Sequence, residues 1–332
     1  MILKNFFEIF PPPRFLTMAS VGLDISDDCV RMMELVSKNK GLIVDSYTER
    51  KFERSPNLSE VYENPELKKA LIDIKKEFKA KFVNVSVNEE HAYIFRTEVP
   101  TKDPSEIRSI LEFQLEENVP IASSEAVFDF RVLKSGQNIH NTHVLVTVLP
   151  KKSVELCTSL LNSVSLIPVS FELRAQAIVN AIIAKGDNEA HMVINIDKQK
   201  TSFYIVHDRI VQFTSMIAFG SESFKDISKN NPESTKSSDV VADEIQRLYI
   251  YWHKHRTENN YGGEEIQKII VNGEGLQLND FCEYVALITR SIVEPSNVWI
   301  NVGDLNSYVP PIHYEQSFSF ASVIGLALKN NN

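Results

Sequence analysis

The chain has 332 residues and a mass of 37.8 kDa; 43% of its residues are hydrophobic and 24% are charged, its formal net charge is −9 and its pI is near 5.5. A protein that coats nucleic acid needs a clustered Lys/Arg surface to neutralise phosphates, so this acidic balance excludes nucleic acid as the expected partner. Cys29, Cys157 and Cys282 are far apart and odd in number. They exclude a disulfide framework and indicate a reducing compartment.

Residues 1–18 form an apolar segment that ends in prolines. Residues 1–10 carry six large apolar side chains, and Pro11-Pro12-Pro13 follow them. No stretch of the chain has the roughly 18 to 20 consecutive apolar residues of a membrane span, and residues 1–10 lack the pattern of a secretory signal. We expect residues 1–10 to pack on their own domain; the alternative is a peripheral contact with a membrane or a partner.

Two parts of the chain repeat one order of elements, β-β-β-α-β. The first has strands at 20–26, 29–36 and 42–52, a helix at 66–79 and a strand at 82–87. The second has strands at 191–197, 202–207 and 210–217, a helix at 240–254 and a strand at 268–272, and a further helix is expected at about 276–287. Two such units predict a duplicated, ribonuclease-H-like α/β architecture.

The two units are separated by an inserted module, residues 87–165, for which a β-α-β-β-α order is predicted. Its strands are expected at 91–99, 126–133 and 142–149, and its second helix at 153–163. The first helix begins after Asp103, with Pro104 at N1 and Glu106 at N3, which is a capping box. Nothing in the module looks catalytic, and the duplicated fold does not need it, so we interpret it as an interaction platform. A strand at 166–173 and a helix at 175–184 lead into the second unit.

Three sequence segments resemble the PilM family of type IV pilus assembly proteins. They are Gly22-Leu23-Asp24-Ile25-Ser26 continuing to Val30-Arg31, the run Leu111 to Pro120 followed by Val127 to Phe130, and Gly325-Leu326-Ala327-Leu328. The second is the most specific, and the resemblance covers about 19–329. The cell-division protein FtsA shares the fold and the inserted module and is the nearest alternative.

The resemblance implies an actin-like fold made of two halves. The first half is expected to comprise 19–86 with 166–188 and 318–332, and the second half 189–225 with 265–317. Residues 226–264 would form a reduced fourth subdomain, since much of this stretch is short and polar.

Proteins of the actin-like superfamily hold Mg-ATP between two loops in which an aspartate is followed closely by glycine. Asp24 and Asp197 end the first strand of each half, and the resemblance makes both of them candidates for ordering magnesium. Ser26 stands where the first loop is expected to have glycine, and Arg31 stands where the superfamily keeps a basic residue near the phosphates.

The remaining parts of the implied nucleotide site are eroded. Lys198-Gln199-Lys200 replace the small residues of the second loop, Gly220 is left from a glycine pair, and Gly273 and Gly275 keep the turn on the adenosine side. Glycines matter here because backbone N–H groups must approach the phosphates without a Cβ in the way. The expectation is therefore a degenerate site: ATP with Mg is the implied cofactor, its binding stays open, hydrolysis is not expected, and the chain is not expected to be an enzyme.

The implied function is that of a cytoplasmic scaffold on the inner face of the cytoplasmic membrane, in type IV pilus or type II secretion-like assembly. In the family, the cytoplasmic tail of a PilN-like membrane protein binds between the inserted module and the first half, and the scaffold couples it to the assembly motor. Glu112, Glu116 and Glu117 are either a solvated face or a docking surface for a basic or amphipathic peptide. The alternatives are an FtsA-like membrane tether and an active actin-like ATPase or sugar kinase.

Overall fold

The computed structural model describes residues 20–38, 41–53, 61–133, 141–224, 232–258, 265–274, 278–303 and 308–329, with the backbone alone at 232–238 and 256–258. The expectations for residues 1–10 and for Gly275 fall outside these ranges. Within them, no helix is both long enough and apolar enough to cross a membrane.

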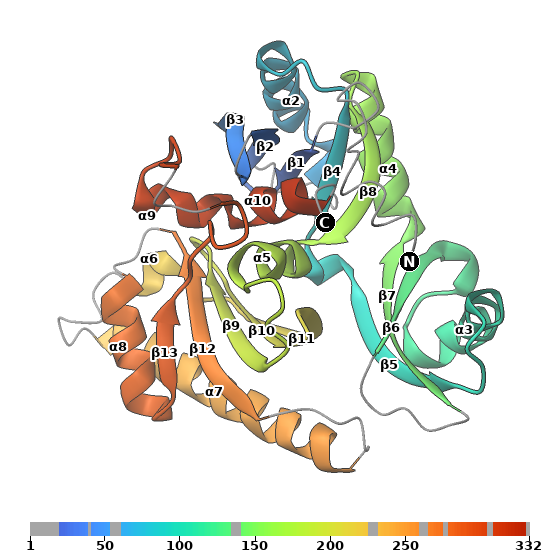
Figure 1. Cartoon of the computed structure of the whole chain (residues 1–332), viewed down its shortest axis with the longest axis vertical. Helices are drawn as coiled ribbons and strands as arrows, with labels where there is room; N and C mark the ends of the chain where they lie inside the picture. Colours follow the sequence, from blue (N-terminus) through green and yellow to red (C-terminus); the bar gives the residue numbers. More distant parts are fainter. Residues whose placement is uncertain are drawn as a thin grey trace.

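Two five-stranded sheets have the same strand order, which gives the predicted duplication a structural form (Figure 1). The first sheet is ordered β3-β2-β1-β4-β8 and the second β11-β10-β9-β12-β13. In each sheet the first three strands in sequence pair antiparallel, and the last two add parallel to them. The strands of the first sheet are β1 (Ser20–Ile25), β2 (Cys29–Lys38), β3 (Gly41–Lys51), β4 (Phe82–Val87) and β8 (Ile167–Leu173). Those of the second are β9 (Ala190–Ile196), β10 (Thr201–His207), β11 (Ile210–Ile217), β12 (Ile266–Gly273) and β13 (Ile292–Pro295).

The helices also correspond between the halves. Each half has one helix before its fourth strand, one before its fifth and one after it; these are α2 (Pro65–Glu77) and α7 (Pro232–Glu258), α4 (Lys151–Ser163) and α8 (Leu278–Thr289), and α5 (Arg174–Ile182) and α10 (Ala321–Leu328). The strands predicted at 20–26, 82–87 and 210–217 are confirmed to within one residue. Sequence analysis missed β13 and the short helices α6 (Ser221–Phe224) and α9 (Tyr314–Ser317), which are too short for a periodic pattern.

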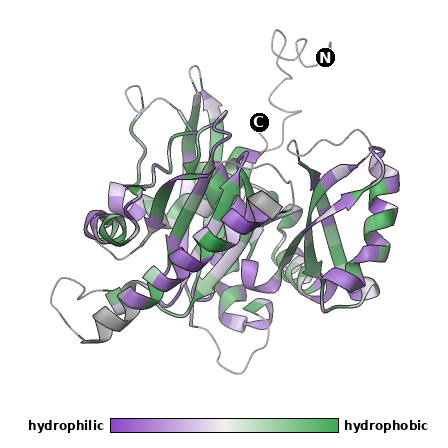
Figure 2. Cartoon of the chain, turned by 90° about the horizontal axis from the view of Figure 1, so that it is seen from below, coloured by the Kyte–Doolittle hydropathy of each residue, from purple (hydrophilic) through white to green (hydrophobic). Residues whose placement is uncertain are grey.

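The inserted module has a core of its own. Its sheet is ordered β5-β7-β6, built from β5 (Tyr93–Val99), β6 (Ala126–Val132) and β7 (Thr142–Pro150), and α3 (Pro104–Asn118) covers one face. As predicted, Asp103 caps α3; its carboxylate accepts a hydrogen bond from the backbone N–H of Ser105 at 2.8 Å. Figure 2 shows the module beside the two halves, with its helix on the outer side.

Helix α4 departs from the expected boundary of the module at residue 165. Its buried side chains, Cys157, Leu160 and Leu161, belong to the hydrophobic core that contains Leu67 and Leu71 of α2 in the first half. The module core instead consists of α3 and the three strands. By packing, the inserted unit therefore ends near residue 150, and α4 is the first half's counterpart of α8.

Helices α5 and α10 cross in backbone contact between the two sheets (Figure 1). A Cβ added to Gly325 of α10 would lie 1.7 Å from the carbonyl oxygen of Ala177 in α5, and one added to Gly22 of β1 would lie 2.3 Å from the carbonyl oxygen of Val323. Helix α10 thus lies directly on the first sheet, whereas α5 contacts β11 of the second. Glycine is needed at Gly22 and Gly325 because no side chain fits.

We expect Gly325→Ala to lower the free energy of unfolding by roughly 1–3 kcal/mol or more, because the new methyl group overpacks the helix crossing. At an exposed helical position, Gly→Ala would raise the free energy of unfolding by about 1 kcal/mol. A loss of stability in Gly325→Ala would therefore show that the methyl group meets the close contact. Gly303→Ala is the matched control, since its Cβ would come no closer than 3.3 Å to another atom. Urea unfolding of the two variants checks this; equal stability would contradict the packing argument.

Candidate functional site

The two aspartates predicted to order magnesium both face one arginine. Asp24 ends β1 and Asp197 follows β9, so the duplicated fold brings both to the cleft between the halves. Arg174, the first residue of α5, makes two hydrogen bonds to the Asp197 carboxylate, at 3.0 and 3.1 Å. Its Nε lies 3.6 Å from Oδ1 of Asp24. The guanidinium therefore stands between the two carboxylates where the superfamily pattern expects a metal ion.

The charges in this triad are buried and mutually stabilised. The Asp24 side chain has no exposed surface and that of Arg174 only 8%. Burial alone would raise the pKa of Asp24, but Arg174, a hydrogen bond from Ser86 and the charge of Arg31 together lower it. Burial would lower the pKa of Arg174, but Asp197 and Asp24 hold it well above its ordinary value. Asp24 and Arg174 are therefore both charged at neutral pH.

Further ion pairs join the two sides of the cleft. Arg31 on β2 donates to Glu49 at 2.6 Å and to Glu274, just after β12, at 2.9 Å. Lys198 pairs with Asp28, and Lys200 reaches Glu90 and, at 3.5 Å, Asp27. The two lysines of the second loop are thus paired with carboxylates of the first half and of the inserted module.

The small residues of the expected phosphate loops have structural roles in this arrangement. Ser26 turns its hydroxyl back to the carbonyl oxygen of Cys29, at 3.0 Å. A Cβ on Gly220 would lie 2.4 Å from the carbonyl oxygen of Asp197, and one on Gly273 would lie 2.7 Å from the Cβ of Ile196. Both glycines therefore allow chain segments to pack closely, and the Ser26 hydroxyl is used within its own turn.

The space left in the cleft is a cavity of about 180 Å³. It is lined by Ser26, Asp27, Asp28, Arg31, Arg174, Asp197, Lys198, Gln199, Lys200 and Glu274. Four of these residues are basic and four are acidic, so the lining is balanced and the basic groups already have carboxylate partners. These residues do not fit a magnesium nucleotide as they stand, because phosphates and metal would have to displace the existing ion pairs.

Arg174 is the central residue of the cleft, and sequence reasoning missed it. The prediction began the helix at residue 175 and gave Arg174 no role. The signal was an arginine next to a helix that is otherwise apolar, since a buried charge needs a partner of opposite sign. The two aspartates were already identified, and either would have been that partner.

A second cavity, of about 200 Å³, lies between the inserted module and the first half. We call it the module groove. Its lining comes from β6 and β7 of the module, from α4, β8, α5 and β11, and from Lys329 after α10. Side chains alternate along β7, and Leu145, Thr147 and Leu149 line the groove, whereas Val144, Val146 and Val148 pack in the core with α3.

The acidic residues predicted for partner binding lie elsewhere. Glu112, Glu116 and Glu117 are exposed residues of α3, and none of them lines the module groove. Helix α3 covers the face of the module sheet opposite to the groove, as the alternation along β7 shows. They therefore do not form a rim of the groove.

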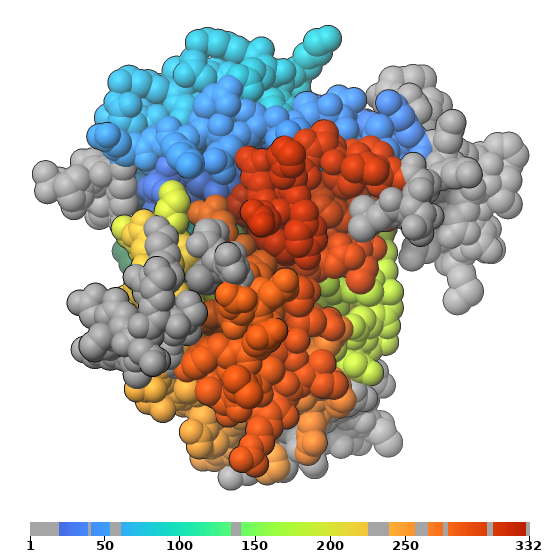
Figure 3. Space-filling model, turned by 90° about the vertical axis from the view of Figure 1, so that its left-hand side faces the viewer, coloured from blue at the N-terminus to red at the C-terminus, as the bar shows by residue number. Residues whose placement is uncertain are grey.

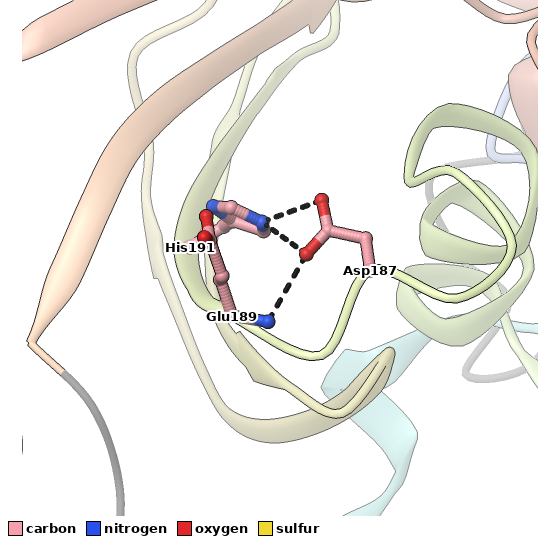
Figure 4. A group of neighbouring side chains, drawn as sticks. All are labelled: Asp187, Glu189 and His191. Atoms are coloured by element: carbon pink, nitrogen blue, oxygen red, sulfur yellow. Dashed lines mark hydrogen bonds and ion pairs between the residues drawn. The ribbon is translucent and has the colours of Figure 1, made fainter.

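One group of potential metal ligands lies among the described residues, at the start of β9 (Figure 4). It consists of Asp187, Glu189 and His191. His191 is fully buried and its Nε2 lies 3.0 Å from both carboxylate oxygens of Asp187, while the backbone N–H of Glu189 donates to the same carboxylate. Nε2 of the imidazole and the carboxylate pair with each other, so we interpret the group as a contact that stabilises the turn between α5 and β9.

Comparison with known proteins identifies a family. Residues 22–233 match the model of the family described as type IV pilus assembly protein PilM. No curated protein matches the chain significantly. The solved PilM-PilN type IV pilus biogenesis complex superposes with a TM-score of 0.72 at 16% identity, covering 94% of this chain and 98% of that chain. This likeness confirms the predicted actin-like fold.

Two further solved structures are more distant. One is the cytoplasmic domain of EpsL, an inner membrane component of the type II secretion system of Vibrio cholerae, with a TM-score of 0.46, 10% identity, and 94% of this chain and 93% of that chain covered. The other is the ethanolamine utilization protein EutJ from Carboxydothermus hydrogenoformans, with a TM-score of 0.45, 12% identity, and coverage of 96% and 90%.

We expect Arg174→Ser to lower the free energy of unfolding by about 3–5 kcal/mol, because it leaves the buried carboxylate of Asp24 and the partly buried carboxylate of Asp197 without their counter-charge. Mg²⁺ should restore part of the loss by binding between Asp24 and Asp197, and should leave the native protein unchanged. Urea unfolding with and without millimolar Mg²⁺ measures both effects.

The matched control is Arg131→Ser, which removes an ion pair between the half-exposed Arg131 and Glu172. An exposed pair of this kind contributes about 0–1 kcal/mol, and Mg²⁺ should have no effect on the variant. A loss for Arg174→Ser no larger than for Arg131→Ser would mean that Arg174 does not hold the cleft.

Proposed function

The chain belongs to the family of the type IV pilus assembly protein PilM, and we propose that it is a scaffold of pilus assembly on the cytoplasmic face of the inner membrane. Its partner is the cytoplasmic tail of a PilN-like membrane protein, which it couples to the assembly motor. One solved structure that superposes on this chain is a complex of PilM with PilN, and that pairing is the precedent for the proposal.

The module groove is the observation that supports this partner. It is a cavity of about 200 Å³ at a junction of two bodies with separate hydrophobic cores, the module and the first half. Such junctions are where ligand sites in proteins tend to lie. The family resemblance implied that the tail binds between the inserted module and the first half, and residues of both parts line this cavity. The proposal does not depend on individual contact residues carried over from other proteins.

The walls of the groove suit a short peptide in extended conformation. Apolar side chains of β7 and β8, among them Leu149 and Phe171, provide pockets for anchoring residues. The strands β6 and β8 are the outermost strands of their sheets in the described residues, so an added strand can pair with their backbone. Glu172, paired with Arg131 of the module and with Lys329, supplies polar groups.

The proposal gives the nucleotide cleft no catalytic role. Arg174 and the lysines of the second loop supply the positive charge that magnesium would bring, so the cleft is stable without a cofactor. Binding of ATP with Mg would need these pairs to open, and turnover would further need free phosphate loops. The family match disfavours the FtsA-like tether, and the ion-paired cleft disfavours an active ATPase. For residues 1–10, packing on their own domain stays the expectation, and a peripheral membrane contact stays the alternative.

We expect Thr147→Trp to block capture of the tail, because the indole would fill the groove from the centre of β7. A synthetic peptide of the cytoplasmic tail of the membrane protein encoded beside this one is titrated, and its fluorescence anisotropy gives Kd. The variant should bind at least tenfold more weakly, which corresponds to about 1.4 kcal/mol.

The control for the groove is Val132→Trp, which adds the same indole at an exposed position of β6 on the α3 side of the sheet. Its affinity for the tail should equal that of the native protein. Native affinity in Thr147→Trp, with both variants folded by circular dichroism, would place the tail outside the groove. Substitutions are preferable to deleting residues 87–165, because that deletion removes α4 from the core of the first half.

We further expect no ATP turnover. Phosphate release from Mg-ATP should be no faster for the native protein than for the Asp24→Asn, Asp197→Asn double variant, which keeps the shape of both side chains while removing their charge. A malachite green assay over several hours measures this. A clear excess for the native protein would restore the ATPase alternative.

A further inference from the structure

The outer face of α3 exposes an aromatic side chain in acidic surroundings. Phe113 is 86% exposed, more than any other large apolar side chain in the described part of the chain. Glu116 and Glu117 lie one helical turn beyond it on the same face, and Glu112 precedes it. We call these four residues the α3 face. Figure 1 shows α3 on the side of the module that points away from both halves.

The stability of α3 does not account for this composition. Carboxylates in the last turn of a helix are unfavourable next to its negative end, and the last turn of α3 contains Glu116 and Glu117 and no basic residue. Glu116 accepts hydrogen bonds from Ser123 and so has a local role. Among the described residues, Glu112 and Glu117 take part in none of the ion pairs, and Phe113 has no cover. Residues that break local rules in this way are expected at functional surfaces.

We propose that the α3 face is a second docking surface, which binds a basic amphipathic segment of a partner protein. Phe113 is the apolar anchor, and the three carboxylates match the positive charges of that segment and speed its association. The charges also argue against other occupants. An anionic membrane surface would be repelled, and a second copy that used the same face would bring like charges together.

The α3 face and the module groove can be occupied at the same time. They lie on opposite faces of the module sheet, because Val144, Val146 and Val148 point to α3 whereas Leu145, Thr147 and Leu149 point to the groove. A three-stranded sheet thus separates the two surfaces. A scaffold that holds a membrane protein in the groove could hold a second partner on α3 without competition.

The test places the photo-crosslinking residue benzoylphenylalanine at Ser109, which is exposed and one turn before Phe113. Cells that make the full chain are irradiated, and the crosslinked peptide is identified by mass spectrometry. We expect a partner segment with net positive charge and regularly spaced apolar residues. Phe113→Ala should lower the crosslinking yield at least fivefold. The crosslinked segment is then resynthesised as a peptide and titrated. The Glu112→Lys, Glu117→Lys double variant should weaken its affinity more at low salt than at high salt.

Two controls separate this proposal from the others. Leu287→Ala removes an equally exposed side chain on α8, 80% exposed, and should leave the yield unchanged. Thr147→Trp, which blocks the groove, should also leave the crosslinking yield unchanged. The proposal for the groove and the proposal for the α3 face can therefore fail independently. Crosslinks only to lipid, only to a second copy of this chain or to nothing, or a yield indifferent to Phe113→Ala, would overturn the proposal.

Discussion

The backbone contact between α5 and α10 fixes the geometry on which the rest of the structure depends. A helix follows each five-stranded sheet in the chain. Helix α10, which follows the second sheet, packs on the first sheet, and α5, which follows the first, contacts β11 of the second, so the crossing of Gly325 over Ala177 joins the two sheets directly. Hydrogen bonds to the backbone of α10 secure its place on the first sheet; Asn84 of β4 donates to the carbonyl oxygen of Leu326 at 3.3 Å, and Ser20 of β1 donates to that of Ala327. Because α5 begins with Arg174, the position of this helix also places the guanidinium in the cleft, between Asp24 of β1 and Asp197 after β9.

The cleft therefore contains its own counter-charges. In an actin-like site that uses nucleotide, the negative charges of the phosphates and the positive charge of the metal complete the electrostatics between the halves. Here Arg174 stands against Asp24 and Asp197, Lys198 pairs with Asp28 of the first half, and Lys200 pairs with Glu90 of the inserted module. Buried charges are costly unless paired, and these pairs offset part of that cost without any ligand. Under the proposed function, halves joined by these ion pairs present the partner surfaces constantly, which suits a scaffold better than a motor.

The sequence predicted the duplication, the repeated β-β-β-α-β order along the chain and the capped helix α3, because these follow from local periodicity and local hydrogen bonds. It also identified Asp24 and Asp197, because each ends a buried strand at a position where open sheets gather ligands. What it could not predict depended on contacts between distant segments. Nothing local separates α4 from the module, since an amphipathic helix covers either core equally well. Only the place of Cys157 and Leu161 in the core that also contains the buried residues of α2 decides. In the same way, Glu112, Glu116 and Glu117 were read correctly as exposed, but which side of the module they occupy depends on the register of β7.

Strand β7 shows how one short segment can serve two surfaces. Its sequence, Thr-His-Val-Leu-Val-Thr-Val-Leu-Pro, is apolar on both faces, a pattern typical of a central strand that is covered on both sides. Helix α3 covers one face, formed by the valines, but no helix of the module covers the face with Leu145 and Leu149. That face instead looks onto β8 and α4 across the module groove. The apolar side chains on this face of β7 thus line the module groove. A bound tail would add the second layer on that face of the strand.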